Sequence, residues 1–307
     1  MNLEAIAPLF PDGTVSAGDQ GIASVWGACA RCHERMSRPP ATIAPVLGPL
    51  VAVCFECLSI AERRALELDL TSAARVQRAL LPAAATALDA WEVAYHWQPL
   101  GIVSGDHVDV LAPPSPGAPL HLLLGDVAGK GVAASLLQSH LHALFRALAP
   151  TDLSLCSLLG RANQLFSAAT AAASYATLTA LRLFDDGRVE LANAGHPRPL
   201  VADGRGVRPV EGADLPLGLL AGAGYQTREL FLAPGETLLL YTDGWTEAAN
   251  VDDEEYGIGR AAASFRRAAS LPLPDLLAAC RADLEAHLGG LPLGDDLSLL
   301  AVRRRAA

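Results

Sequence analysis

The stretch LHLLLGDVAGKGVAASLL, from Leu120 to Leu137, contains the succession of patterns from which the fold can be worked out. Its apolar opening, bounded by turn residues, predicts a buried strand over residues 120–124. A glycine-rich turn follows, and the apolar periodicity over residues 131–148 predicts a helix. Asp126 stands between the two, shortly after the strand. The stretch therefore predicts a strand, an acidic turn and a helix in that order.

The chain beyond Pro82 repeats this alternation of strand and helix patterns. Asp185, Asp186 and Gly187 form a hairpin-turn signal between two of the strands. Strands joined by hairpins, with helices inserted in pairs, favour an α+β fold in layers over a parallel doubly wound sheet. The expected strands are 91–97, 120–124, 175–184, 189–193, 237–242 and 297–302, and the expected helices are 131–148, 153–169, 259–269 and 274–288.

Aspartates stand where the apolar strands begin or end, and they are Asp106, Asp109, Asp126, Asp243, Asp295 and Asp296. Taken alone, each fits a turn or helix-cap residue. A buried ionised carboxylate is costly unless it is paired or binds a metal, and Lys130 is the exception to a lack of nearby cations. If the strands converge, these hard oxygen ligands favour Mg²⁺ or Mn²⁺ over Zn²⁺. Their shared position at strand ends predicts a divalent metal site.

Two Cys-x-x-Cys pairs near the N-terminus predict a second, different metal site. They are Cys29 with Cys32 and Cys54 with Cys57. Each tight turn directs two sulfurs at one point, and four thiolates suit a tetrahedral structural zinc ion. Residues 1–60 have too little apolar core to fold without such a metal. The alternative is four reduced thiols whose spacing is coincidental.

A helical pattern over residues 61–81 connects the two regions and stops at Pro82. Apolar residues recur along it at alternating steps of four and three, which is typical of a coiled-coil seam. This favours a homodimer formed through the linker helix. A single amphipathic helix lying on its own domain is the alternative, because the pattern is only about three heptads long. The seam positions are Leu66, Leu70, Ala73, Gln77 and Leu80.

Charge and composition exclude several classes of protein. The 307 residues include 23 Lys and Arg against 33 Asp and Glu, a net charge of −10, which argues against a nucleic-acid binder. The opening MNLEAIAPLF lacks the basic start of a signal peptide. The most apolar stretch, 41–55, is interrupted by proline and glycine and is too short to span a bilayer. We expect a cytoplasmic protein with neither membrane nor nucleic acid as partner.

Seven motifs in order resemble the metal-dependent protein phosphatases (PPM), specifically the bacterial branch similar to stage II sporulation protein E, which includes sigma-factor-regulating phosphatases. The resemblance covers about three quarters of the chain. It implies a two-layer antiparallel β-sandwich flanked by helices, with two metal ions at one edge of the sheets. The motifs are ARVQRALLP, SGDHVDV, GDVAGKGVAASLL, NAGHP, LPLGL, YTDGWTEA and GDDLSLL.

The resemblance also assigns roles, which are carried over by motif position. Asp126 and Asp243 are the expected catalytic carboxylates, and Asp126 would bridge two Mn²⁺ or Mg²⁺ ions. NAGHP is expected to be a turn near the site, with His196 as the alternative source of a proton. The expected metal ligands are Asp106, Asp126, the Val127 carbonyl, Asp243 and Asp295, with Asp296 as the less certain member of its pair.

Three positions depart from the commonest family pattern, and none of them removes a carboxylate. Ser104 replaces a glycine, and Ser298 stands where many members have threonine. Lys130 stands where many members have histidine, so it adds a cation that would either weaken metal binding or help hold phosphate. The departures do not contradict an active enzyme.

The resulting hypothesis is a serine/threonine protein phosphatase in which water activated by two metals attacks the phosphorus of a phosphorylated regulatory protein. By resemblance, that protein is an anti-sigma-factor antagonist. The expected domains are 1–60 for zinc, 61–82 for the linker helix and 83–307 for the phosphatase. The alternatives are a pseudo-phosphatase scaffold that binds a phosphorylated partner and, less compatible with the acidic charge, a zinc-ribbon nucleic-acid adaptor.

Overall fold

The computed structural model describes residues 41–43, 51–53, 59–88, 90–113, 115–170 and 174–305. The chain divides into two units, Met1–Ser72 and Ala73–Ala307. In the first unit, β1 (Ala41–Ile43) and β2 (Val51–Val53) pair antiparallel. All four cysteines of the proposed zinc site lie outside the described residues, so that site stays a prediction.

Helix α1 (Ile60–Leu80) begins in the first unit and ends in the second. Its start is fixed by a capping box, because Ser59 donates its backbone and hydroxyl hydrogens to Glu62 at 2.8 Å and accepts the Glu62 backbone N–H at 3.3 Å. Within the second unit, the helix buries Ala74 and Gln77. The predicted helix is thus present within one residue at each end, while its role as a dimerising linker stays a prediction.

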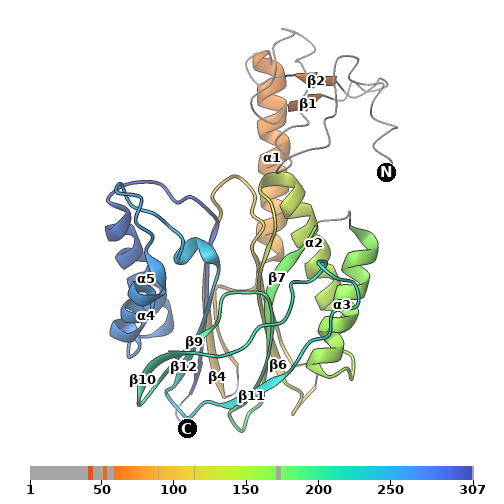
Figure 1. Cartoon of the computed structure of the whole chain (residues 1–307). Coiled ribbons are helices and arrows are strands. Elements are labelled where there is room, and N and C mark those ends of the chain that lie inside the picture. Colours follow the sequence, from red (N-terminus) through yellow and green to blue (C-terminus); the bar gives the residue numbers. More distant parts are fainter. Residues whose placement is uncertain are drawn as a thin grey trace. The chain divides into compact units, whose positions relative to one another are not determined.

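Two antiparallel sheets form the centre of the second unit (Figure 1). One has six strands in the order β10-β9-β12-β13-β4-β3, and the other has five in the order β11-β8-β7-β6-β5. The six-stranded sheet contains β3 (Ala85–Leu88), β4 (Trp91–Gln98), β9 (Leu200–Asp203), β10 (Gly206–Pro209), β12 (Thr237–Tyr241) and β13 (Leu297–Arg304). The five-stranded sheet contains β5 (His107–Leu111), β6 (Leu120–Val127), β7 (Ala176–Leu183), β8 (Arg188–Ala194) and β11 (Arg228–Phe231).

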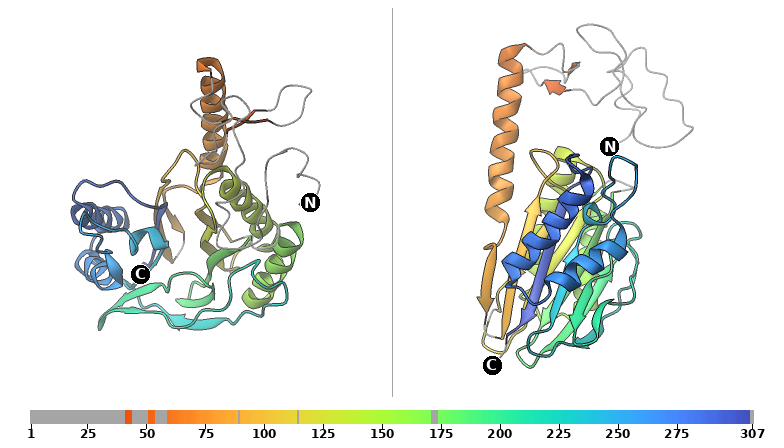
Figure 2. Two further views of the ribbon diagram at one scale, coloured as in Figure 1. Left: turned by 45° about the horizontal axis from the view of Figure 1, so that its top comes forward. Right: turned by 90° about the vertical axis from the view of Figure 1, so that its left-hand side faces the viewer.

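Each sheet is covered on its outer face by a pair of helices. Helices α4 (Gly257–Ala268) and α5 (Leu273–Leu288) pack on the six-stranded sheet, and α2 (Gly131–Leu148) and α3 (Leu155–Ala169) pack on the five-stranded sheet. Figure 2 shows the resulting layers from two further directions. The predicted sandwich flanked by helices is therefore confirmed. Among the helices of the described residues, none is long and apolar enough to cross a membrane.

The central strands are buried on both faces, which explains their nearly continuous apolar sequence. In β12, Leu238 and Leu240 enter the core between the two sheets, while Leu239 and Tyr241 enter the core under α4 and α5. The same alternation occurs in β6, where Leu122 faces the other sheet. Because successive side chains point to opposite faces of a strand, a continuous apolar run supplies two cores at once.

Candidate active site

Five of the six strand-end aspartates come together at one edge of the sandwich, and they come from both sheets, whereas Asp109 lies on β5 and pairs with Arg146 instead. Asp106 precedes β5, and Asp126 lies near the end of β6. Asp243 starts a short 3-10 turn after β12, while Asp295 and Asp296 precede β13. Since neither sheet supplies the whole set, the site depends on how the two sheets are stacked.

Two turns of the six-stranded sheet touch through Gly244, which brings Asp243 beside the other carboxylates. A Cβ atom at Gly244 would lie 2.0 Å from the carbonyl oxygen of Asp296 and 3.5 Å from the Cβ of Asp295. Any side chain there would therefore force the turns apart. This is a physical reason for glycine after Asp243 in the YTDGWTEA motif.

The charges of these carboxylates interact strongly. Burial, followed by the charges of Asp243, Asp295 and Asp296, raises the pKa of Asp126 to about 7. Burial and the charge of Asp295 also raise the pKa of Asp243. In both residues the ionised form is disfavoured by desolvation and by like charges. When these carboxylates are ionised, their negative charge therefore exceeds the positive charge of the residues around them.

Asp106 is buried deepest and is held by hydroxyl groups of the opposite sheet. Its Oδ2 atom accepts hydrogen bonds from Ser298 Oγ at 2.5 Å and Thr242 Oγ1 at 3.1 Å. Burial and the charge of Asp126 raise its pKa well above the usual range, although both hydroxyl groups act in the opposite direction. Ser298, one of the departures from the family pattern, thus supplies the same kind of donor as threonine would.

Both carboxylate oxygens of Asp296 accept hydrogen bonds, and these bonds connect the two sheets. One oxygen accepts the Leu100 backbone N–H at 2.6 Å, and the other accepts Ser104 Oγ at 2.7 Å and the Gly105 N–H at 2.9 Å. The Ser104 hydroxyl also accepts the Asp106 backbone N–H at 3.0 Å. A glycine at position 104, as in the common family pattern, could not form these two hydrogen bonds of the Ser104 hydroxyl.

Lys130 is the one lysine of the sequence and lies at this site. Its ammonium pairs with Asp295 Oδ2 at 2.7 Å and donates to the Gly294 carbonyl at 3.0 Å. The lysine side chain is 60% exposed, so water screens the pair strongly. The predicted cation beside the aspartates is therefore present.

The donor set fits hard divalent cations. Several carboxylate oxygens with raised pKa values meet one exposed ammonium, and oxygen ligands of this kind suit Mg²⁺ or Mn²⁺. The backbone also approaches closely, since a Cβ at Gly105 would lie 3.0 Å from the Val127 carbonyl oxygen and 3.2 Å from Asp126 Oδ1. A bound cation would relieve the repulsion that raises these pKa values.

A cavity of about 580 Å³ adjoins the aspartates. Asp243, Thr177, His196, Arg198 and Glu211 are among the residues that line it. Burial lowers the pKa of His196 to about 3, which disfavours the imidazolium form that would donate a proton near pH 7. Its backbone N–H and carbonyl form hydrogen bonds with the Asn193 side chain at 2.8 and 2.9 Å, as expected for a structural turn.

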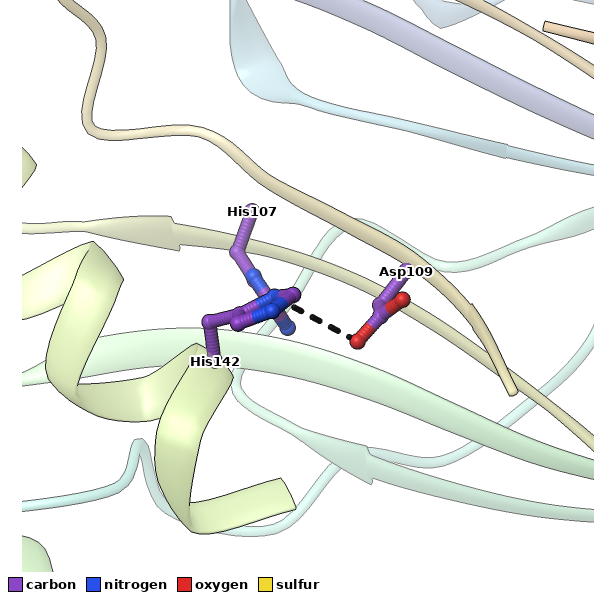
Figure 3. Close-up of side chains that lie close together, drawn as sticks. All are labelled: His107, Asp109 and His142. Atoms are coloured by element: carbon purple, nitrogen blue, oxygen red, sulfur yellow. Dashed lines mark ion pairs between the residues drawn. The ribbon is translucent and has the colours of Figure 1, made fainter. Parts of the chain in front are cut away.

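A second group of potential metal ligands contains Asp109, which the sequence pattern placed with the other strand-end aspartates, and two histidines that no such pattern indicated. His107 and Asp109 on β5 and His142 on α2 place their ligating atoms within 4.8 Å of one another (Figure 3). Arg146, however, already donates two hydrogen bonds to Asp109, at 2.6 and 2.9 Å. A cation entering this group would have to displace that guanidinium.

The hydrogen bonds of His107 exclude it as a ligand in this arrangement. Gln138 accepts a hydrogen bond from Gln77 at 3.2 Å through Oε1, so its amide nitrogen is the group that faces Nδ1 of His107 at 3.1 Å. The ring proton must then be on Nε2, and neither ring nitrogen offers a free electron pair. We interpret this group as an ion pair between the buried Asp109 and the exposed Arg146, beside two packed imidazoles.

Comparison with known proteins shows the family to which the chain belongs. Residues 116–305 match the family model of stage II sporulation protein E (SpoIIE). The phosphoserine phosphatase RsbP of Bacillus subtilis is 29% identical over 129 residues, which are 40% of this chain and 32% of RsbP. The chain spans less than half the length of the curated relatives it matches.

Solved structures agree with this match. The PP2C domain of SiaA from Pseudomonas aeruginosa superposes with a TM-score of 0.70 and 26% identity, covering 80% of this chain and 99% of that domain. The catalytic domain of PstP, solved with two manganese ions, shares the fold with a TM-score of 0.53 at 15% identity, covering 70% and 99% of the two chains. The chain therefore belongs to the SpoIIE family and has its PP2C-type phosphatase fold.

Proposed function

We propose that the protein is a metal-dependent serine/threonine protein phosphatase that hydrolyses phosphoserine or phosphothreonine on a regulatory protein. The observation that carries this proposal is the convergence of carboxylates from both sheets with raised pKa values and one exposed lysine. Membership of the SpoIIE family and the similarity to RsbP and SiaA support it. By the same similarity, the substrate is a phosphoserine protein of a sigma-factor pathway, such as an anti-sigma-factor antagonist.

The proposed metal ligands are oxygen atoms at the shared edge of the sheets. Asp126, the Val127 carbonyl, Asp243 and Asp295 would hold Mn²⁺ or Mg²⁺, with Asp106 completing the set. When bound, two such ions supply a water nucleophile and stabilise charge on the phosphoryl oxygens. We assign Asp295 rather than Asp296 as the direct ligand, because three hydrogen bonds engage the Asp296 carboxylate.

The chain's own residues position these ligands. Thr242 and Ser298 fix the Asp106 carboxylate by donating to Oδ2, which leaves its other oxygen for the site. Asp296 holds the segment that contains Ser104 and Gly105, and so sets the distance between the two sheets at this edge. Such prior positioning removes the need to reorganise the site during the reaction.

The test is hydrolysis of an aryl phosphate and of phosphoserine peptides by the full chain with Mn²⁺, compared with the same protein in EDTA. Metal-dependent phosphate release that Asp126→Asn abolishes is the expected result. Release that persists in EDTA would contradict the metal-dependent mechanism. Tight binding of a phosphopeptide without any release would instead favour a pseudo-phosphatase scaffold.

The remaining parts of the hypothesis concern the regions on the N-terminal side. We propose residues 1–60 as the zinc-binding segment, 61–82 as a linker helix that forms a homodimer, and 83–307 as the phosphatase domain. The division of the chain near residue 72 supports a separate N-terminal part. Sedimentation equilibrium of the full chain tests the dimer, since a monomer at all concentrations would contradict it.

A further inference from the structure

We propose that Arg198 binds an oxyanion of the substrate in the cavity beside Asp243 and thereby determines which phosphoproteins are accepted. The inference rests on the proposed phosphatase function and adds a specificity-determining residue to it. Arg198 lines the same cavity of about 580 Å³ as Asp243. This volume lies within the range of about 300–1,000 Å³ that is usual for ligand sites, and it leaves room for groups beyond a phosphoseryl side chain.

The backbone holds Arg198 in a fixed place at the cavity. The preceding turn is closed by the Asn193 side chain, which bonds to both backbone groups of His196. Gly195 has a positive φ of 71°, and a Cβ there would lie 2.6 Å from Pro216 Cγ. A turn that is fixed by hydrogen bonds and by close packing presents the next side chains in one direction.

The charges around the cavity make Arg198 the group suited to an anion. Three carboxylates line the cavity, those of Asp243, Glu211 and Glu247, and Arg198 is the one lysine or arginine among the described lining residues. Metal binding at Asp243 would neutralise one end of the cavity. At the other end, Arg198 would attract an anionic substrate when its guanidinium is not paired with Glu211, and the carboxylates would otherwise repel it.

In the protein without substrate, the guanidinium of Arg198 is paired with the carboxylate of Glu211. Arg198 donates to Glu211 at 2.5 Å, and the two side chains are 54% and 73% exposed. Ion pairs between exposed side chains contribute little stability in water, so a substrate oxyanion can replace Glu211 at small cost. A planar guanidinium then offers two parallel N–H groups to a phosphate or carboxylate.

The oxyanion has two possible sources, which share this chemistry. It is either an oxygen of the phosphoryl group itself or the carboxylate of an acidic residue next to the phosphoserine. The experiment compares Arg198→Ala with wild type on an aryl phosphate, on a phosphoserine peptide with an acidic neighbour, and on the same peptide with a neutral neighbour. Arg208→Ala is the matched control, because Arg208 is an exposed arginine paired with Asp203 and does not line the cavity.

We expect Arg198→Ala to raise KM about tenfold on at least one substrate, with kcat changed less than about twofold, since the lost contact is a charge-assisted hydrogen bond made on binding. A rise on all three substrates identifies the phosphoryl oxygen, and a rise confined to the acidic peptide identifies the carboxylate. Glu211→Gln should lower KM on the same substrates, because it frees the guanidinium. Arg208→Ala should leave KM unchanged.

Unchanged KM on all three substrates for Arg198→Ala, in protein with wild-type thermal stability, overturns the inference while leaving the proposed function intact. If the wild-type protein releases no phosphate, the proposed function is wrong. The role of Arg198 in binding an oxyanion is then tested by a binding measurement. Fluorescence anisotropy with a labelled phosphonate analogue of the acidic peptide should show weaker binding to Arg198→Ala than to Arg208→Ala. Equal binding to the two variants overturns the inference in that case.

Discussion

Asp126 illustrates how strongly burial and like charges act on one carboxyl of the proposed metal site. Its pKa of about 7 in the folded protein, against 3.8 for a free aspartate, means that folding favours its protonated form. A carboxyl whose pKa is raised by folding stabilises the fold at low pH, and this stabilisation is lost as pH rises through the folded pKa. The raised pKa values of Asp106 and Asp243 act in the same direction.

The metal-free protein should therefore become less stable between about pH 4 and pH 7, the window between the ordinary pKa of 3.8 and the folded pKa of about 7 at Asp126. Thermal unfolding in EDTA should show the melting temperature falling across this range. Saturating Mn²⁺ should remove most of the fall, because the cation replaces the proton. Asp126→Asn in EDTA should flatten the dependence, whereas an equally steep fall in this variant would contradict the assignment.

Asp243→Asn should reduce kcat by more than about a hundredfold, since a metal contributes several kcal/mol to such a reaction. The variant should nevertheless melt at or above the wild-type temperature in EDTA, because it removes one of the repelling charges. Steady-state kinetics with Mn²⁺ and thermal unfolding are the two measurements. Asp253→Asn, in an exposed turn, is the control for the substitution itself.

Lys130→Gln should tighten Mn²⁺ binding a few-fold, because the ammonium at 2.7 Å competes with the cation for Asp295. The effect is small because the lysine is exposed and screened. Isothermal titration with Mn²⁺ at two salt concentrations measures it, and the difference from wild type should shrink at high salt. Weaker binding by the variant would show that Lys130 supports the site by another route.

At the scale of elements, the end of α1 differs from the heptad interpretation. That pattern predicts Gln77 at a dimer seam, but its side chain is only 4% exposed and bonds within the domain. The amide donates to the Ser104 carbonyl at 2.7 Å and accepts the Ser104 N–H at 3.0 Å. The seam assignment of Gln77 is therefore wrong, whereas the dimer itself stays a prediction for the rest of the helix.

Gln77→Leu should lower activity rather than strengthen dimerisation. The substitution leaves both backbone groups of Ser104 without partners, and it loosens the segment that Asp296 and Asp106 share. We expect a loss of about 1–3 kcal/mol in unfolding free energy, the usual cost of unsatisfied buried polar groups. Chemical denaturation and Mn²⁺-dependent kinetics check this, with Val76→Leu on the exposed side of α1 as the control.

The sequence predicts well the central strands, which have two buried faces, and the long helices. The central strands β6, β7, β12 and β13 and all the long helices appear within a few residues of expectation, because their apolar patterns are long. Short peripheral strands such as β10 and β11 were missed, since each has four residues and exposed side chains. Their pairing depends on neighbouring strands rather than on their own pattern.

The sequence likewise predicts one part of the candidate site and gives no indication of another part. Aspartates after apolar strands predicted the convergence, because burial of a carboxylate demands a reason. No sequence pattern indicates that Asp296 bonds across the sheets or that Arg198 lines the cavity. These depend on the stacking of two sheets from distant segments, which local periodicity does not encode.

At the scale of the whole chain, the N-terminal cysteines predict a metal chemically distinct from the catalytic ions. Full-length protein should contain about one tightly held zinc per chain, because thiolates bind Zn²⁺ strongly and carboxylates exchange their cations. Elemental analysis after dialysis against EDTA measures it. Cys29→Ser with Cys57→Ser should remove the zinc and leave hydrolysis of an aryl phosphate unchanged, and wild type without zinc would contradict the N-terminal hypothesis.

The position of β13 has a consequence for the timing of activity during protein synthesis. This strand lies between β12 and β4, and its residues pair with a strand about two hundred positions earlier in the chain. It also follows directly after Asp295 and Asp296. A ribosome must therefore release nearly all of the phosphatase domain before the six-stranded sheet can close. We expect nascent chains to lack the proposed phosphatase activity until β13 has left the ribosome and paired with β4 and β12.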